Sequence, residues 1–335
     1  MRYARAASLV DLVGRHILVT GATGFIGSHL VPALVDAGAR VTAVATGLGW
    51  RPTVRSLVLQ GSVRLVELDV LSPASPSPRA LTDTLVGVDG VVHLEYAPAG
   101  GRPLARAALE VERNVLGALR LFQALPESVR SVVFASSIMV YGRSPVLPVD
   151  EACCARPHTA YAKAKHTIEG LMEDLAADRG VAAYNLRYAT VYGEMETVPR
   201  AVPNFIRRVL GGQAPVIRGA GDDVHDYVHV SDAVGATLSA IARDETGTWT
   251  CNVASGHGRT TNEIAARVAA LAGYYGPVTH VPAEASPTHV VCDIRHAEAL
   301  LGYEPRMDID EGLRQEIRWF AARPALWSTP ATAPT

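Results

Sequence analysis

Short β-branched runs alternate with helical patterns through the first half of this chain, and the alternation restricts the folds open to it. The runs typical of strands are residues 17–19, 39–46, 63–70, 88–94, 129–137 and 181–189. Apolar residues recur at helical spacing over 104–124 and 161–178. Such alternation predicts an α/β fold of the Rossmann type, a doubly wound parallel sheet with helices on both faces.

Beyond residue 190 the strands become shorter and prolines interrupt the helical patterns, as in VPRAVPNFIRRVLGG at 198–212. We expect a dinucleotide-binding part over residues 1–187 that also receives about 225–254. A smaller, interleaved C-terminal part for the substrate then takes 188–224 and 255–325. The last residues, 326–335, are expected to form a disordered tail.

The stretch VTGATGFIGSHL, residues 19–30, places three glycines between the first strand and a helical pattern. In a strand-to-helix turn, Gly21 allows the sharp turn, Gly24 lets the backbone approach a pyrophosphate, and Gly27 lets the helix pack closely. The helix N-terminus offers N–H groups and a positive dipole end to phosphates. The spacing is G-x-x-G-x-x-G rather than G-x-G-x-x-G, so a tight turn without a ligand stays open on this stretch alone.

Charge and composition exclude several classes of partner. The net charge of −2 over 335 residues, with 19% charged residues, gives no strong field for nucleic acid or an anionic membrane surface. Apolar stretches stop short of the roughly 18 residues that a membrane span needs, so we expect a cytoplasmic protein that binds a small molecule. The four cysteines lack metal-ligand spacing and predict neither a disulfide framework nor a metal site.

Tyr161 and Lys165, in YAKAKHTIEGLMEDLA, stand four residues apart in a helical pattern and therefore share one face. An ammonium beside a phenol stabilises the phenolate, which predicts a pKa for Tyr161 lowered from about 10 toward the range of a working acid or base. Ser136 and Ser137 follow a strand at the edge where open α/β sheets bind ligands. A hydroxyl there can hold the reacting oxygen of a substrate, although a serine that caps a loop has the same signature.

These features occur in the order and at the spacings of the extended short-chain dehydrogenase/reductase family. Over about residues 15–320 the chain resembles its sugar-nucleotide epimerase/dehydratase branch, including RYATVYGE, HDYVHVSDA and IRHAEALLGYEP toward the C-terminus. The resemblance implies that Tyr161 moves the hydroxyl proton, that Lys165 lowers the pKa of Tyr161 and binds the nicotinamide ribose, and that Ser137 orients the substrate oxygen. Asn114 matches a helix asparagine that is structural or part of a proton relay in the family.

The resemblance also assigns binding residues. For the cofactor, NAD or NADP, it implies Gly21, Thr23, Gly24, Phe25, Ile26, Gly27, Thr46, Arg51, Asp69, Val70, Leu94, Glu95, Tyr161, Lys165 and Tyr188. For the substrate it implies Ser137, Met139, Thr190, Glu194, Arg218 and His225. Asp69 and Val70 occupy the positions that touch the adenine.

The second strand departs from the family pattern at its end. Where NAD-binding members carry an acid that accepts hydrogen bonds from ribose hydroxyls, this chain has Ala45 and Thr46. Nothing there repels a 2′-phosphate, and Arg51 and Arg55 could pair with one. NADP therefore stays open beside NAD.

A second departure concerns the substrate side. His225 replaces an arginine that grips the substrate's pyrophosphate in the family, and a second such arginine is missing from PAEASPTHVVCDI at 282–294. The candidates to replace them are Arg207, Arg208 and Arg218. These changes bear on whether the substrate is a nucleotide sugar.

Two short stretches bear on the chemistry. HLEYA at 93–97 has Glu95 and Tyr96 where the family has small residues, either near the nicotinamide or on the surface. Ile138 and Met139 follow Ser137, where dehydratases and 3,5-epimerising members have titratable side chains. We therefore expect redox at one carbon only. Any other acid or base would have to come from Glu95, Glu194 or Cys154.

The leading interpretation is an enzyme, a NAD(P)-dependent epimerase or oxidoreductase that acts on a carbinol or ketone carbon of a nucleotide-linked sugar by hydride and Ser-Tyr-Lys proton transfer. The alternatives are an NADP-dependent ketoreductase for a non-nucleotide substrate and, in another class, a non-catalytic dinucleotide sensor. We also expect a homodimer, because 104–124 and 161–178 match the helix pair that forms an intermolecular four-helix bundle in the family.

Overall fold

The computed structural model describes residues 12–49, 52–72, 77–98, 103–144, 146–283 and 288–327. Within them the large sheet contains β1 (His16–Thr20), β2 (Arg40–Ala45), β3 (Val63–Glu67), β4 (Gly90–His93), β5 (Ser131–Ser137), β6 (Ala182–Tyr188) and β10 (Gly247–Val253). These strands are all parallel, in the order β10-β6-β5-β4-β1-β2-β3. The predicted doubly wound sheet is confirmed.

The strand order reverses at β1, which lies between β2 and β4. In open α/β sheets, ligands bind in the crevice outside the carboxyl ends of the strands at such a reversal. Here the carboxyl end of β1 leads into the glycine turn, β4 leads into Leu94 and Glu95, and β5 ends at Ser137. The fold therefore brings the expected site residues to one edge of the sheet.

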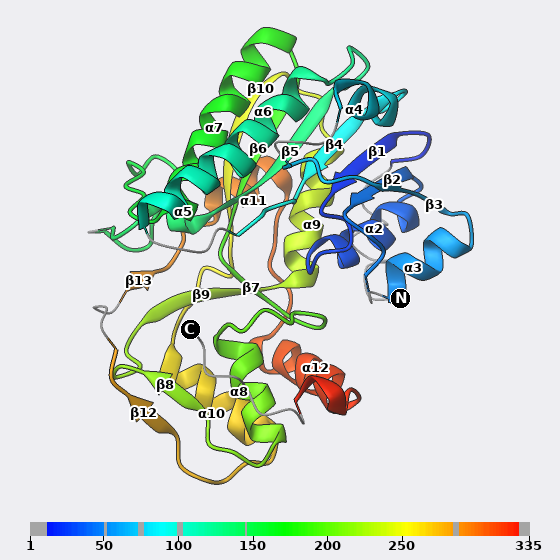
Figure 1. Cartoon of the computed structure of the whole chain (residues 1–335). Coiled ribbons are helices and arrows are strands. Elements are labelled where there is room, and N and C mark those ends of the chain that lie inside the picture. Colours follow the sequence, from blue (N-terminus) through cyan, green and yellow to red (C-terminus); the bar gives the residue numbers. More distant parts are fainter. Residues whose placement is uncertain are drawn as a thin grey trace.

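Helices cover both faces of the large sheet (Figure 1). One face carries α4 (Pro78–Leu85), α6 (Leu116–Gln123) and α7 (Ala160–Arg179), and the other carries α2 (Gly27–Asp36), α3 (Pro52–Leu59), α9 (Val230–Ile241) and α11 (Arg295–Leu301). Alternate residues of a strand point to opposite faces, so Ile17 and Val19 enter one apolar core and Leu18 the other. Among the described residues, none of the helices is long and apolar enough to cross a bilayer.

The helical pattern at 104–124 is not a single α-helix. It contains α5 (Pro103–Leu109), a π-helical segment η1 (Glu110–Val115), and then α6. Segments of this kind are frequent at functional sites. Glu110 and Asn114, both within η1, are buried.

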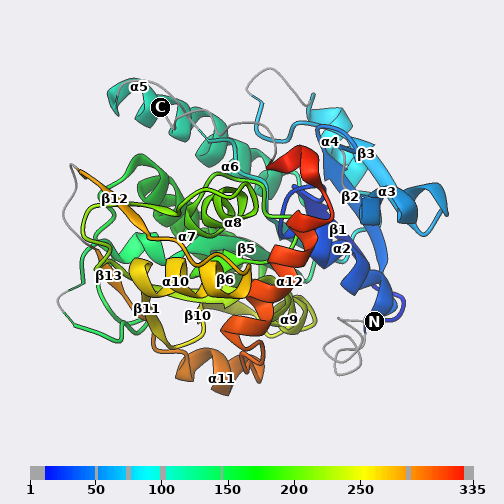
Figure 2. The same ribbon diagram turned by 90° about the horizontal axis from the view of Figure 1, so that it is seen from below.

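The smaller part lies below the large sheet in Figure 1. Its strands are β7 (Thr190–Tyr192), β9 (Val224–His229), β11 (Gly258–Thr260) and β13 (His289–Val290) in one sheet, and β8 (Val216–Arg218) paired with β12 (Thr279–Val281). A third apolar core joins α8 (Ala201–Leu210), α10 (Thr261–Leu271) and α12 (Ile309–Ala321). Figure 2, seen from below, shows these helices in front of the large sheet.

Two boundaries differ from the expected ones. Residues 225–229 belong to β9, which pairs with β7, β11 and β13, so the return to the larger part begins at α9. At the expected tail, Leu326 ends a short 3-10 helix, η3 (Pro324–Leu326), and the Trp327 indole donates to the Phe320 carbonyl at 3.0 Å. The remaining tail residues, 328–335, lie outside the described chain.

Candidate active site

The glycine turn after β1 leaves a backbone cradle that a larger residue would fill. Gly21 has φ +66°, and a Cβ built on it would lie 2.9 Å from the backbone nitrogen of Glu95. A Cβ on Gly24 would lie 3.0 Å from the Gly21 carbonyl oxygen, and one on Gly27 would overlap the same oxygen. The N-cap residue of α2 is Ile26, and within the described chain no side chain caps the N–H groups at this end of the helix. The free N–H groups and the glycine surface fit a dinucleotide pyrophosphate.

The predicted end of β2 is confirmed, since Ala45 is its last residue and the exposed Thr46 follows. Thr23 Oγ1 donates to the Gly47 carbonyl oxygen at 3.1 Å, which ties the glycine turn to this strand end. Arg51, expected to contact the cofactor, lies outside the described residues.

Apolar side chains complete the turn. Phe25, Ile26 and Leu94 are partly buried and pack against the core beneath the turn. The Phe25 ring meets the His29 ring edge-on, with 5.8 Å between centroids. These residues hold the turn in place, and its polar groups come from the backbone.

Glu95 lies partly buried against the glycine turn and not on the surface. Burial, and after it the charge of Asp69, raises the pKa of Glu95 to about 7, while Arg113 and a backbone hydrogen bond from Val70 lower it. Asp69 is itself paired with Arg113 at 3.2 Å. Glu95 Oε2 is buried without a hydrogen-bond partner among the described residues. A buried oxygen of this kind suits a donor from a bound ligand.

Ser137 and Tyr161 are hydrogen-bonded to each other at the carboxyl end of β5. Ser137 Oγ also accepts a hydrogen bond from the backbone N–H of Met139, at 3.2 Å, and so caps η2 (Ile138–Tyr141). The Met139 side chain is 38% exposed. Burial raises the pKa of Tyr161, and the bond to Ser137 lowers it only in part. The lowered pKa predicted from Lys165 is wrong here, because desolvation is the larger effect.

Lys165 lies one helical turn after Tyr161 and is buried. Its ammonium donates to the Ala135 carbonyl oxygen at 2.6 Å and lies 4.7 Å from the centroid of the Phe134 ring and 5.8 Å from that of Tyr161. Burial lowers the pKa of Lys165 to about 7, and two nearby carboxylates act in the opposite direction. The ammonium therefore gives up its proton close to neutral pH.

Sequence reasoning missed Glu110 and left the place of Tyr96 open. The Tyr96 hydroxyl donates to Glu110 Oε1, and the Tyr96 ring meets the Tyr161 ring edge-on at 4.9 Å between centroids. Asn114 Nδ2 donates to Glu110 Oε2 at 2.8 Å, and Asn114 also exchanges two hydrogen bonds with the Ala97 backbone. The signal available was the aromatic residue in HLEYA, but its acidic partner is 14 positions away in a π-helical segment.

Tyr188, expected at the cofactor, is instead a core residue. It ends β6, is buried, and its hydroxyl is hydrogen-bonded to that of Thr237 on α9 at 2.6 Å. The side chain therefore points into the core on the α9 face. Thr190 begins β7, and Glu194 follows it with Oε2 3.6 Å from His229 Nε2.

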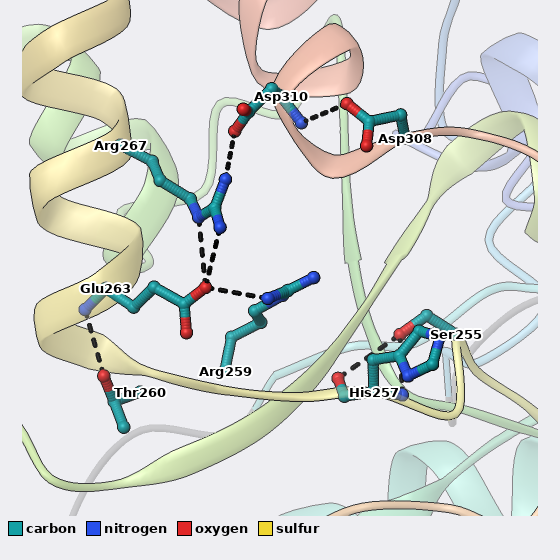
Figure 3. A network of polar contacts seen from close by, with 8 residues as sticks. All are labelled: Ser255, His257, Arg259, Thr260, Glu263, Arg267, Asp308 and Asp310. Carbon is teal, nitrogen blue, oxygen red and sulfur yellow. Dashed lines mark hydrogen bonds and ion pairs between the residues drawn. The ribbon is translucent and has the colours of Figure 1, made fainter.

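His225 faces Arg259 across the antiparallel pair of β9 and β11. Directly opposite residues of antiparallel strands point to the same face, so Arg259 lies on the same face as the position where the resemblance leads us to expect an arginine. Figure 3 shows Arg259 and Arg267 both bound to Glu263, at 2.8 and 3.0 Å. Burial lowers the pKa of His225, so its ring is uncharged at neutral pH.

The arginines suggested by the sequence as replacements are placed differently. Arg207 donates to the Thr197 carbonyl at 2.7 Å and Arg208 to the Ala214 carbonyl at 2.5 Å, so both hold backbone of the smaller part. Arg218 ends β8 and is exposed. Arg259 was missed because β11 has three residues and gives no readable alternation.

Known proteins resemble this chain over most of its length. The family model described as the NAD dependent epimerase/dehydratase family matches residues 17–254. UDP-glucose 4-epimerase of Neisseria meningitidis serogroup B is 27% identical over 345 residues, which cover 92% of this chain and 98% of that protein. The structure of UDP-glucose 4-epimerase from Thermotoga maritima with UDP-glucose is 27% identical, with a TM-score of 0.82, and covers 92% of this chain and 99% of its own. MoeE5 in complex with UDP-glucose and NAD is 32% identical, with a TM-score of 0.80 and the same coverage.

Proposed function

Because the chain belongs to the NAD dependent epimerase/dehydratase family, we propose that it is a 4-epimerase of a UDP-linked hexose. It is an NAD-dependent enzyme of the extended short-chain dehydrogenase/reductase type. The observation that carries the proposal is the hydrogen-bonded pair of Ser137 and Tyr161, with Lys165 one turn further, at the sheet edge that holds the glycine cradle. UDP-glucose 4-epimerases among the similar proteins support the substrate class.

Each residue has one task in the proposed reaction. NAD, when bound at the glycine turn, would supply the acceptor and then the donor for the hydride of the sugar C4. Tyr161 in its phenolate form takes the proton of the sugar 4-hydroxyl and becomes a neutral phenol, which returns that proton to the ketone oxygen in the second half of the reaction. Ser137 holds that sugar oxygen by a hydrogen bond, and the Lys165 ammonium stabilises the phenolate of Tyr161. A sugar that presents its other face between the two halves leaves with inverted configuration.

We assign the substrate diphosphate to the smaller part, beside His225 and Arg259. An uncharged imidazole donates a hydrogen bond but supplies no charge, whereas a guanidinium binds phosphate oxygens in a bidentate manner. The Arg259 side chain is 31% exposed, so it remains accessible to a ligand while Glu263 orients it. Arg259 would then supply the charge that His225 lacks.

UDP-glucose incubated with the protein in deuterated water is expected to form its 4-epimer without deuterium at the carbons next to C4. Ile138 and Met139, which follow Ser137, have no titratable proton and cannot expel water or epimerise a neighbouring carbon. Proton NMR of the product measures its configuration and its label together. The dinucleotide released when the protein is denatured is expected to be NAD.

Other products would point to other chemistry. Deuterium beside the reacting carbon, or a product that has lost a hydroxyl, would contradict redox at one carbon. Glu95→Gln would then be the first variant to examine, because a pKa of about 7 suits an acid or base at neutral pH. No conversion of UDP-glucose or UDP-glucuronic acid, with net oxidation of NADPH on a ketone, would replace the epimerase by a reductase.

We also propose a homodimer built on α5, η1, α6 and α7. Large apolar side chains are exposed along this surface, namely Leu104 (85%), Leu109 (41%), Val111 (51%) and Leu116 (41%). A groove of about 240 Å³ between α6 and α7 is lined by further apolar side chains, among them Leu119, Phe122, Leu171 and Leu175. Exposed apolar patches of this kind are typical of protein interfaces, and two such helix pairs can form a four-helix bundle.

Sedimentation at micromolar protein is expected to give twice the chain mass of 35.5 kDa. Leu116→Asp should shift the mass toward one chain, because it would bury a carboxylate in an apolar interface. Leu59→Asp is the matched control, since Leu59 is 75% exposed at the end of α3 on the opposite face of the large sheet. That variant should remain dimeric. A wild-type mass of one chain would contradict the proposal.

A further inference from the structure

Glu110 and Tyr96 form a buried pair beside the residues on which the proposed reaction relies. Glu110 is 3% exposed, and its Oε1 accepts the hydrogen bond of the Tyr96 hydroxyl. The Tyr96 ring packs edge-on against Tyr161, and Lys165 Nζ lies 5.2 Å from its centroid. The segment η1 directs Glu110 inward, where a carboxylate is tolerated only with hydrogen bonds or a positive partner.

Two carboxylates, Glu110 and Glu169, raise the pKa of Lys165, and their hydrogen-bond partners differ. Glu169 is bound by the Arg187 guanidinium at 2.9 and 2.8 Å, so much of its charge is neutralised locally. Glu110 accepts hydrogen bonds from uncharged donors, among them the Asn114 amide at 2.8 Å. These bonds hold the carboxylate in place, and its negative charge raises the pKa of Lys165.

We propose that Glu110 is the counter-charge of Lys165, a positioning residue that favours the protonated ammonium, and that Tyr96 orients this carboxylate. The proposal rests on the proposed function for the role of Lys165 in turnover. The proposal also gives a role to Tyr96 in HLEYA. Its ring contacts the Tyr161 ring, and its hydroxyl donates a hydrogen bond to Glu110 in η1.

The groups around Lys165 determine the direction of the expected effect. The titratable and charged groups that face Lys165 or its neighbours are His93 (β4), Tyr96 (the loop after β4), Arg106 (α5), Glu110 (η1), Tyr161, His166 and Glu169 (α7), Arg187 (β6) and Arg200 (before α8). Burial lowers the pKa of Lys165 to about 7, and Glu110 and Glu169 raise it. His93 is uncharged, because burial lowers its pKa to about 3. Without the carboxylate of Glu110, Lys165 would lose its proton at a lower pH.

The chain contains two lysines, Lys163 and Lys165, so lysine labelled with ¹³C at Cε gives two NMR signals. The exposed Lys163 is the internal reference. In Glu110→Gln, the titration midpoint of Lys165 is expected to fall by about one pH unit, since a nearby opposite charge shifts a pKa by about 1–3 units. The pH above which turnover declines should also decrease. Glu112→Gln, the same change on an exposed side chain of η1, should leave the midpoint where it is.

Two further variants separate charge from shape. Glu110→Asp keeps the charge and should return the midpoint toward the wild-type value. Tyr96→Phe combined with Glu110→Leu replaces both partners of one hydrogen bond by apolar groups. Asn114 loses its bond to Glu110 and keeps its two bonds to the Ala97 backbone. This double variant should lower the midpoint as Glu110→Gln does, and it gives the answer if the glutamine variant does not fold.

An unchanged Lys165 midpoint in a folded variant without the carboxylate would overturn the proposal. The NMR titration needs no substrate, so it gives its result even if UDP-sugars are not converted. If UDP-glucose is converted and the midpoint does not move, the proposed function stands and the role of Glu110 is rejected. If the midpoint falls and no UDP-sugar reacts, the counter-charge stands and the epimerase is rejected.

Discussion

Turnover of a UDP-hexose is expected to fall by about 10²- to 10⁴-fold when Tyr161 is replaced by phenylalanine, with NAD binding almost unchanged. The lost hydroxyl carries the proton in the proposed reaction and is bonded to Ser137. The ring itself is partly buried and packs edge-on against Tyr96, with 4.9 Å between centroids, and phenylalanine keeps this contact. Steady-state kcat measures the first effect, and the NAD released on denaturation measures the second.

Tyr188→Phe is the matched control, since Tyr188 is a second buried tyrosine with a hydrogen-bonded hydroxyl. Its bond to Thr237, at 2.6 Å, lies inside the core. The substitution should lower the free energy of unfolding by about 1 kcal/mol and leave kcat unchanged. Full activity in Tyr161→Phe would remove the acid/base assignment. Loss of NAD binding in Tyr188→Phe would instead support the assignment of Tyr188 to the cofactor site.

The large sheet could be predicted from the sequence because its central strands are buried on both faces. β5 and β6 are buried at every residue, and strands of this kind read as continuous β-branched runs. The predicted runs 129–137 and 181–189 differ from β5 and β6 by at most two residues at either end. In the smaller part, β7, β8 and β11 have three residues each, too few for a pattern, and pairing across the chain decides where they form.

The candidate site divides in the same way between local and distant contacts. Tyr161 and Lys165 could be paired from the sequence because residues four apart in a helix are neighbours. The bond from Tyr96 to Glu110 could not, since it depends on a π-helical segment that has no sequence signature in this chain. The direction of the Tyr161 pKa was missed for a related reason. A nearby charge can be read from spacing, but burial is known only once the fold is known.

Gly27→Ala is expected to lower the free energy of unfolding by about 1–3 kcal/mol and to weaken NAD binding. Helix propensity alone predicts no loss, because alanine is favoured over glycine by about 0.8–1.0 kcal/mol in a helix interior and Gly27 is the first residue of α2. At Gly27 the steric effect is larger. The added Cβ would overlap the Gly21 carbonyl oxygen and the Ala22 backbone, which cannot rotate away as a side chain could. α2 would have to move away from the turn, together with its N-terminal N–H groups, where we expect the pyrophosphate to bind.

Gly170→Ala shows whether the contact, and not the residue type, decides the result. Gly170 is exposed in α7, and a Cβ there would meet nothing within 4 Å. The substitution should therefore raise the free energy of unfolding by about 0.5–1 kcal/mol and leave the affinity for NAD unchanged. Urea unfolding of both variants and titration with NAD measure the two quantities. If Gly27→Ala were as stable as the wild type, α2 could not be packed on the turn so closely, and glycine at position 27 would lose its steric explanation.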